Sequence, residues 1–520
     1  MAPPPVAHTG DHLPEGVCRT RPVPSRDRRD RLVPPIHPDL FGRTVSRRGL
    51  LAAAGAGLAT AALVSASPAA AASAATVPRI DTLALFRQTY PGGLRTLHVS
   101  GAGDDARSGL RPDQAKRSIQ AAVDISRPGD RIVVATGSYG HTEFFDRHGT
   151  PTAWITIEAA PGARAVVDVS ASRASWDRTR WTNGLDVQLS SHVGVHGLEI
   201  RGDQASPDPD PSGVAVFRRS RAVAIWACDV HDFPGGGVNC FATGAATVGG
   251  TALPAGGWDA VDVFFNRVHA TSRRSTYNTS GISFFGGQSL GSSVGDGRYG
   301  YRAVGNHVFD VVCKVPYVPG GFDFVTDGNG ISVDSLAVPN SLSAGLPPYP
   351  KRGLVEGNVV VACGGRGVYV YNSRDVDVVN NTVVGNLRTA SPAITGSTDI
   401  AVVLDRPVAH NGVVIANNVI APLSTARAFD RVAQTVVGNT ALGGTDPVPG
   451  GNSSQRRSGL SAFRIRPSVA SLAAGLDPAS LAPRVDRLVA RRSGSSGLPV
   501  LGRGTRAVGS TIPVGAVRNG

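Results

Sequence analysis

The chain has 520 residues, of which 41% are hydrophobic and 18% are charged, so it can bury a large core and its composition excludes a disordered protein. Its 64 Gly, against five Trp and one Met, indicate many turns and short strands. The net charge of +13 comes from the ends, because residues 1–75 have nine Arg against five acidic residues and residues 451–520 have eleven Arg against two. The central part is neutral, which argues against a nucleic-acid-binding protein.

An export segment is the first predicted element. Residues 44–51 read Thr-Val-Ser-Arg-Arg-Gly-Leu-Leu, an uncharged Ala-rich stretch extends to Ala75, and residues 72–74 match an A-x-A cleavage site. The stretch is short and weakly hydrophobic for a membrane span. It resembles a twin-arginine (Tat) signal peptide, which implies export of a folded protein. We expect residues 1–75 to contain this signal and the mature protein to be secreted, extracellular, monomeric and without stable membrane insertion. An N-terminal anchor that is not cleaved is the alternative.

A short helix is predicted after the export segment. Residues 118–125 have apolar side chains at helical spacing, and Pro128-Gly-Asp130 ends the helix. Strand-like segments at 97–100 and 131–135 flank it.

From residue 184 onward, a Gly followed by alternating apolar residues recurs along the chain. Period-two alternation places the second and fourth residues of each segment on one face of a strand. Stacked strands would bury one row formed by Leu185, Val214, Val238, Ile282, Ile331, Val368 and Ile400. They would bury a second row formed by Val187, Val216, Cys240, Phe284, Val333, Val370 and Val402.

A second series interleaves with the first, in which an apolar strand leads into an Asn and then resumes. The series contains Asn266, Asn306, Asn358, Asn381, Asn418 and Asn439. Asn tolerates the left-handed backbone that a tight corner needs, and stacked Asn side chains can hydrogen-bond between neighbouring coils. The two series predict a solenoid that is stabilised by the stacking of its coils.

Together, the helix, the Gly-led strands and the asparagine corners resemble the pectate-lyase-like right-handed β-helix superfamily. The resemblance covers residues 95–450. It implies an all-β fold, a right-handed parallel β-helix with a short N-terminal capping helix, that binds a polysaccharide; residues 451–520 would form a C-terminal cap and a basic tail. The Arg-x-Pro-x-x-Arg signature of some pectate lyases and the signatures of polygalacturonases are absent. The resemblance is therefore one of fold and not of a defined active site.

The outward-facing residues of the Gly-led strands predict a binding face. They place aromatic and acidic side chains beside one another on successive coils: Phe217, Phe241, Phe285, Asp334, Tyr369 and Tyr371. Exposed rings suit the C–H faces of sugars, whereas burial of the rings under inserted loops is the alternative. The main insertions lie near 242–258, 271–280, 286–300, 311–329 and 335–352.

Charged residues around Asp334 indicate the chemistry. The insertion before its strand supplies Lys314, Asp323 and Asp327, and Arg366 precedes the next strand. A lyase acting on a uronate-containing glycan needs a base, for which Lys314 or Arg366 is the candidate, and a cation or metal that neutralises the uronate carboxylate. This polysaccharide lyase is the leading hypothesis.

A calcium site and two other functions remain open alongside the lyase. Asp327, Asn329 and Asp334 could hold Ca²⁺ through oxygen ligands. Some pectate lyases of the superfamily use a Lys base beside an Asp-bound Ca²⁺. Lys314 and the nearby Asp residues resemble this arrangement, but they cannot be matched to it residue by residue. A glycoside hydrolase would use Asp323 and Asp334 as its two carboxyl groups. A non-catalytic surface or adhesion protein would only bind glycan.

Two further sets of residues, three histidines and four cysteines, carry predictions of their own. Three histidines follow predicted strand ends in successive coils and could act as ligands or bases: His231, His269 and His307. Four cysteines follow the export segment and match no zinc pattern: Cys228, Cys240, Cys313 and Cys363. We expect small buried thiols, with a disulfide between the first two as an alternative.

Overall fold

The computed structural model of the protein describes residues 81–170, 183–248, 250–292, 297–338, 345–405, 407–408, 410–423, 427–429, 435–437 and 439–441. The predicted export segment in residues 1–75 and the predicted cap and tail in residues 451–520 lie outside the described residues. Among the described residues, no helix is long and apolar enough to span a membrane.

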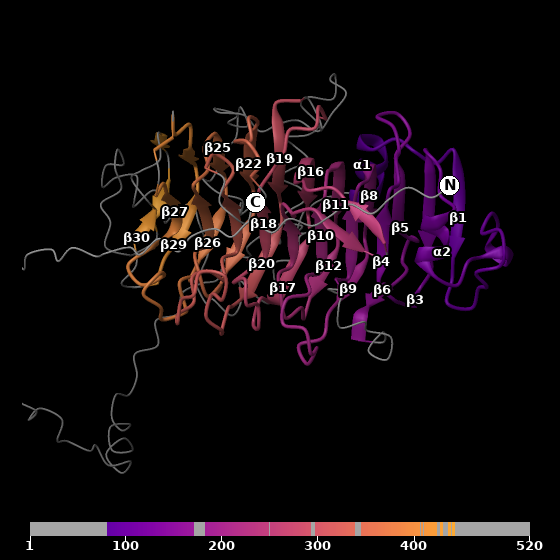
Figure 1. Ribbon diagram of the computed structural model, residues 1–520, viewed down its shortest axis with the longest axis horizontal. Helices are drawn as coiled ribbons and strands as arrows, with labels where there is room; N and C mark the ends of the chain where they lie inside the picture. Colours follow the sequence, from indigo (N-terminus) through magenta and orange to yellow (C-terminus); the bar gives the residue numbers. More distant parts are fainter. Residues whose placement is uncertain are drawn as a thin grey trace, which may run out of the picture. The chain divides into compact units, whose positions relative to one another are not determined.

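The described residues form three long parallel sheets (Figure 1). Sheet A contains β1 (Arg95–Val99), β2 (Asp130–Val134), β5 (Ile155–Ala159), β8 (Ser191–His196), β11 (Ser220–Trp226), β16 (Trp258–Phe264), β19 (Tyr299–Val304), β22 (Arg352–Glu356), β25 (Val376–Val379), β28 (Val414–Ala416) and β31 (Thr435–Val437). Sheet B contains β3 (Gly137–Tyr139), β6 (Ala165–Asp168), β9 (Glu199–Arg201), β12 (Asp229–His231), β17 (Arg267–Thr271), β20 (His307–Val311), β23 (Val359–Val361), β26 (Thr382–Val384), β29 (Val419–Ala421) and β32 (Thr440–Ala441). Sheet C contains β4 (Thr142–Phe145), β7 (Leu185–Gln188), β10 (Val214–Phe217), β13 (Val238–Cys240), β18 (Ile282–Phe285), β21 (Ile331–Asp334), β24 (Val368–Tyr371), β27 (Thr398–Val403) and β30 (Arg427–Phe429).

From β2 onward the chain visits sheets A, B and C in turn, and each visit adds one coil to the stack seen in Figure 1. The departure from this order is the antiparallel hairpin of β14 (Ala246–Val248) and β15 (Thr251–Leu253), which lies in the predicted insertion at 242–258. The protein is a right-handed parallel β-helix, as predicted.

The N-terminal end of the stack has the predicted capping helix, α2 (Ile119–Asp124), preceded by the 3-10 turn η1 (Pro112–Gln114). Ser118 begins α2, because its hydroxyl accepts a hydrogen bond from the backbone N–H of Ala121. The apolar residues of α2 are buried against the core: Ile119, Ala122 and Val123.

A second helix, α1 (Thr82–Thr89), was not predicted from the sequence. It packs on the outer face of sheet A, where Phe86 meets Trp226 edge to face at a ring-centroid distance of 5.7 Å. Beside it, the Tyr90 hydroxyl donates a 2.6 Å hydrogen bond to Asp262, which also forms a buried bidentate pair with Arg302. The hydrogen bonds from Tyr90 and Arg302 to Asp262 compensate for the loss of hydration of the buried ion pair.

The two predicted interior rows of sheet C are confirmed. Leu185, Val214, Val238 and Ile282 lie directly opposite one another on successive strands and are fully buried. The Gly before each strand has a steric reason. A Cβ on Gly213 would lie 2.1 Å from a methyl group of Val230 in β12, the next strand of sheet B along the chain, so even Ala does not fit there.

The asparagine corners form a continuous ladder, as predicted. In Asn306, Oδ1 accepts hydrogen bonds from the backbone N–H and the side chain of Asn266, both at 3.0 Å, and Nδ2 donates to Asn358 at 2.9 Å and to the Val263 carbonyl at 2.8 Å. The same pattern links Asn266, Asn306, Asn358, Asn381, Asn418 and Asn439. The ladder residues satisfy the buried polar groups of each corner.

The predicted reason for Asn at these corners was wrong in one respect. For the five ladder residues from Asn266 to Asn418, the left-handed backbone belongs to the residue before the Asn, for example Phe265 (φ 59°), Asn380 (φ 58°) and Asn417 (φ 56°). The ladder Asn itself is therefore selected by its side-chain hydrogen bonds and not by its backbone conformation.

The four described cysteines are free and buried, which agrees with the expectation of small buried thiols and leaves no disulfide between Cys228 and Cys240. Burial raises the pKa of Cys228 and Cys363 to about 12. These thiols are therefore protonated at neutral pH and poor nucleophiles.

Asp399 at the start of sheet C strand β27 predicts a pH-dependent stability. It is fully buried, its Oδ1 accepts a 2.9 Å hydrogen bond from Asn386, and its Oδ2 has no partner among the described residues. Burial raises its pKa to about 7. Because the folded-state pKa lies above the unfolded one, this group favours folding below pH ~4 and loses that contribution as the pH rises through about 7.

Asp399→Asn changes the free energy of unfolding, and we expect this change to be about 4 kcal/mol more stabilising at pH 9 than at pH 4. Urea denaturation at pH 4, 7 and 9 measures this difference. Asp113→Asn, at an exposed carboxylate, is the matched control and should change little at any pH. A constant difference between wild type and Asp399→Asn across this range would contradict a raised pKa.

Candidate functional site

The outer face of sheet C brings the predicted aromatic and acidic residues together. Phe285, Asp334 and Tyr371 lie directly opposite one another on β18, β21 and β24. Phe217 and Phe241 lie on the two coils before Phe285, and their ring centroids are 5.1 Å apart. We call these five residues the outer row. The pairing of Phe285, Asp334 and Tyr371 is the one that the sequence predicted.

The rings of the outer row are oriented differently from a flat sugar-binding platform. Phe217 and Phe241 are nearly parallel, at an interplanar angle of 7°, so each covers one face of the other. The guanidinium of Arg218 lies 5.5 Å from the Phe217 ring centre, and Phe217 is only 8% exposed. The buried ring of Phe217 therefore forms an apolar floor. The rings of Phe241 and Phe285 are partly exposed. Their binding of glycan stays a prediction.

Asp334 is the titratable residue at the centre of the site. Its Oδ1 accepts a 2.7 Å hydrogen bond from the Ser335 hydroxyl. Burial, joined by the negative charges of Asp327 and Asp405, raises its pKa to about 7 against the opposing effect of that hydrogen bond. A carboxyl group with this pKa exchanges a proton near neutral pH, as a general acid or base does.

Two tyrosines lie beside Asp334 on β24. The Tyr371 hydroxyl donates a hydrogen bond to Asp405, which follows β27. Tyr369 is buried, and the guanidinium of Arg366 lies 4.3 Å from its ring centre. Tyr371 is therefore the more accessible of the two predicted sugar contacts, and Asp405 is a site residue that sequence reasoning missed.

Arg366 is held by the loops around the site. Its Nε donates to Ser397 at 3.1 Å, Nη1 donates to the Thr326 carbonyl at 2.8 Å, and Nη2 donates to the Ala393 carbonyl. The backbone N–H of Arg366 donates to Asn329 Oδ1 at 2.8 Å. A guanidinium in this position ties two loops together and supplies positive charge near Asp327.

The predicted calcium ligands are close together but already bonded. Asp327 accepts hydrogen bonds from Thr326 at 2.7 Å and from Asn329 at 2.6 Å, and burial raises its pKa. Within the described residues, no three His, Cys, Asp or Glu side chains are grouped so that they could hold a metal ion. Ca²⁺ binding by Asp327, Asn329 and Asp334 stays a prediction.

Lys314 and Asp323 are exposed on the insertion between β20 and β21. The same insertion carries Tyr317, whose pKa is raised by burial and by the charges of Asp334 and Asp327. The insertion thus returns to the outer face of sheet C beside Asp334. Tyr317 is a second neighbour that sequence reasoning missed, because its loop has no repeat pattern.

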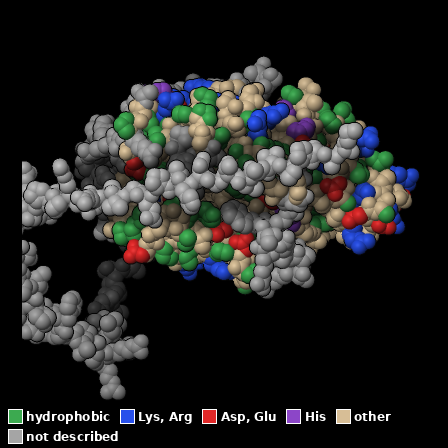
Figure 2. Space-filling view, viewed as in Figure 1, with side chains coloured by type: hydrophobic (Ala, Val, Ile, Leu, Met, Phe, Trp, Pro, Cys, Tyr) green, Lys and Arg blue, Asp and Glu red, His purple; other side chains and the backbone are tan. Residues whose placement is uncertain are grey.

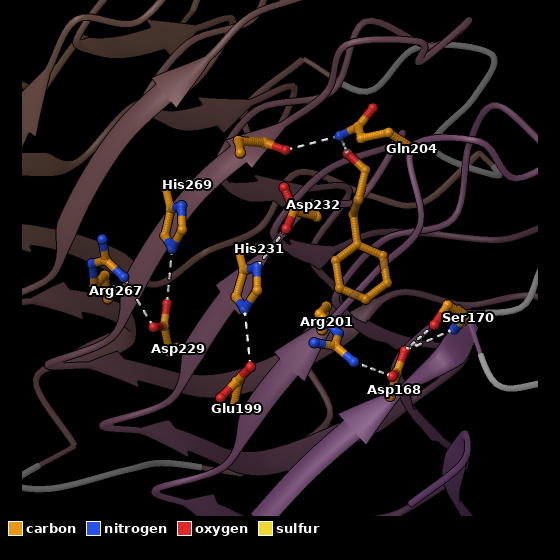
Figure 3. Close-up of polar contacts among 12 residues, drawn as sticks. Asp168, Ser170, Glu199, Arg201, Gln204, Asp229, His231, Asp232, Arg267 and His269 are labelled. Atoms are coloured by element: carbon orange, nitrogen blue, oxygen red, sulfur yellow. Dashed lines mark hydrogen bonds and ion pairs between the residues drawn. The ribbon is translucent and has the colours of Figure 1, made fainter. Parts of the chain in front are cut away.

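His231 and His269 lie opposite each other on β12 and β17 of sheet B (Figure 3). His231 and His269 stack with ring centroids 5.0 Å apart, and the stack continues with Phe309 at 4.7 Å. His231 bonds to Asp232 at 2.8 Å and His269 to Asp229 at 3.1 Å. His307 lies opposite Arg267 and not opposite His269, so it does not extend the stack of His231 and His269.

On the face shown in Figure 2, described Lys and Arg side chains are interspersed with Asp and Glu and gather into no single-sign patch. This mixture of positive and negative side chains agrees with the zero net charge of residues 76–450. It does not steer a polyanion to this face from a distance.

The sequence matches no protein-family model and no curated protein. Among solved structures, the chain is similar to pectate lyase Pel9A, with 14% identity and a TM-score of 0.40 over 82% of this chain and 96% of that one. A rhamnogalacturonan lyase matches with 13% identity and a TM-score of 0.38 over 67% of this chain and 74% of that one. A lacto-N-biosidase from Eubacterium ramulus matches with 14% identity and a TM-score of 0.34 over 67% of each chain. Similarity at this level assigns no reaction or substrate to this chain.

Proposed function

We propose that the protein cleaves a polysaccharide on the outer face of sheet C, with Asp334 as the group that transfers or shares the proton. The observation that supports this proposal is the position of Asp334. It continues a row of aromatic residues in register, and its pKa is raised to about 7. A carboxyl group kept partly neutral at working pH can donate a hydrogen bond or a proton to a substrate.

The first form of the reaction is elimination on a uronate-containing glycan. Protonated Asp334 would share its proton with the uronate carboxylate, which makes the neighbouring C–H bond more acidic. Lys314 is the better base of the two predicted, because it is exposed on the adjoining insertion, whereas the guanidinium of Arg366 already donates to three loop oxygens. Asp327 would orient the substrate or a Ca²⁺ ion.

Hydrolysis is the second form, and it is favoured by the carboxyl groups around Asp334. Asp405 is hydrogen-bonded to Tyr371, the residue opposite Asp334, and its charge contributes to the raised pKa of Asp334. Protonated Asp334 would then be the acid, with Asp405 or the exposed Asp323 as the second carboxylate. A protein that only binds glycan would need none of these groups.

The products of cleavage distinguish these functions. The protein is incubated with pectins, alginates, glycosaminoglycans and neutral glycans, and both ultraviolet absorbance and reducing ends are followed. Elimination raises both signals, because it leaves an unsaturated uronate, whereas hydrolysis raises only the reducing ends. Retained binding with neither signal would refute cleavage and leave a binding protein.

Calcium dependence is a separate prediction. If Asp327, Asn329 and Asp334 act through Ca²⁺, EDTA should abolish ultraviolet-detected cleavage and added Ca²⁺ should restore it. Asp327→Asn should then raise the Ca²⁺ concentration needed for half-maximal activity. Activity that is unchanged in EDTA would exclude a metal step and favour Asp334 acting alone.

We also propose that the protein is exported through the twin-arginine pathway and acts as a monomer outside the cell. The support is the paired arginines and the A-x-A site within residues 44–75. Replacing both Arg47 and Arg48 with Lys should retain the protein inside the producing cell. N-terminal sequencing of the exported form should begin near Ala75.

A further inference from the structure

Arg218, at the end of β10, is a buried cation with too few partners. The residue is 9% exposed, and its Nη1 donates one long hydrogen bond of 3.4 Å to Gln188 Oε1. Its Nε has no partner among the described residues. Burial lowers the pKa of Arg218, and the charge of Glu143 offsets this only in part. A desolvated guanidinium in this state costs stability unless something compensates for it.

The two other buried arginines of the described coils have more hydrogen-bond partners than Arg218. Arg302 makes two bonds to Asp262, at 2.6 and 2.7 Å, and Arg366 donates to three loop oxygens. No comparable anion meets Arg218 among the described residues. The carboxylate of Glu143, whose charge acts on Arg218, accepts a hydrogen bond from the side-chain amide of Gln188, and no hydrogen bond joins it to the guanidinium among those of the described residues.

The surroundings of Arg218 belong to the outer face of sheet C. Gln188 lies directly opposite Phe217, the first ring of the outer row, and the guanidinium lies over that ring. Phe217 thus supplies an apolar floor, Gln188 and Glu143 supply polar groups at one side, and Arg218 supplies the charge. A planar guanidinium with an unused N–H favours a carboxylate.

We propose that Arg218 binds the carboxylate of a uronate unit of the glycan, at a subsite remote from the cleavage point. The subsite is three strand spacings from Asp334, through β13 and β18, or about 14 Å. This inference rests on the proposed function, because it takes the outer row as the path of the chain. It names the substrate class as an anionic glycan long enough to reach from Arg218 to Asp334.

Binding measured without cleavage tests the subsite. In an Asp334→Asn background, calorimetry compares oligomers of galacturonate, mannuronate and glucuronate with their methyl esters of equal length. The best-bound oligouronate should lose 10- to 100-fold in affinity on Arg218→Gln, its ester should change little, and Arg218→Lys should recover part of the loss. Arg219→Gln removes an exposed charge next to it and is the matched control.

The outcomes separate this inference from the proposed function. Equal affinities of Arg218→Gln and its parent for every oligouronate, with unchanged thermal unfolding, overturn the subsite even if cleavage occurs. Failure of every oligouronate to bind, or equal losses for the ester and for Arg219→Gln, also overturns it. Arg218-dependent binding of an oligouronate, together with no cleavage of any glycan by the wild-type protein, supports the subsite and refutes the proposed cleavage.

Discussion

Asp334→Asn is expected to lower kcat on the cleaved glycan by roughly 100- to 10,000-fold, the usual contribution of one proton-transferring group. Asn has the shape of the carboxyl group but cannot transfer a proton. Substrate binding should remain, because the apolar floor and Arg218 are untouched. Steady-state kinetics on the substrate identified by the product assay measure the loss. Asp310→Asn, which removes a carboxylate from sheet B, is the matched control.

The pH dependence of the same reaction follows from the raised pKa of Asp334. Where Asp334 acts without Ca²⁺, both forms of cleavage need its protonated carboxyl group, so kcat should fall as the pH rises through about 7. Ser335→Gly removes the hydrogen bond that stabilises the carboxylate, so the pKa should rise further and the fall should move to higher pH. Gly fits the left-handed backbone of Ser335, at φ 54°. An unmoved pH profile in Ser335→Gly, or full activity in Asp334→Asn, would assign the proton transfer elsewhere.

Asn381→Ala is expected to produce the largest loss of stability, about 4 kcal/mol or more. Its side chain accepts two hydrogen bonds from Asn358, at 3.0 and 2.9 Å, and donates to Asn418 and to the Val355 carbonyl, at 3.0 and 2.9 Å. Ala would remove these four hydrogen bonds from buried groups in the middle of the stack. Urea denaturation measures the change in the free energy of unfolding.

Asn380 offers a control one residue away. Its side chain makes a single hydrogen bond, to Glu356 at 2.9 Å, and its φ of 58° suits Gly. Asn380→Gly should therefore cost about 1 kcal/mol or less. Similar losses for the two variants would mean that the ladder contributes no more than an ordinary surface contact.

The repetitive part of the fold could be predicted from the sequence because each coil repeats the same local rule. Alternation fixed the inward residues of sheet C, and the recurring Asn marked one corner of every coil. Helix α1 has no such repeat, and its docking depends on Trp226 and Asp262, which come from other coils. Nothing in its own sequence indicates that surface.

The site could be predicted only as a set of rows. Period-two alternation placed Asp334 beside Phe285 and Tyr371, but it does not fix side-chain rotamers, so the mutual stacking of Phe217 and Phe241 was not foreseen. The role of Arg366 depends on carbonyl groups from two irregular loops. Arg218 is informative only through its missing partner, and that requires coordinates.

Because the step between coils is constant, the distance between two residues along sheet C can change only in multiples of one strand spacing. Every added or deleted coil between β10 and β21 would move Arg218 and Asp334 apart or together by one strand spacing, about 4.8 Å. Side chains on the two retained strands would keep their orientation, since the register is unchanged. Adding or removing coils would thus change the length of glycan that spans Arg218 and Asp334 in whole increments, while both ends of the site stay unchanged.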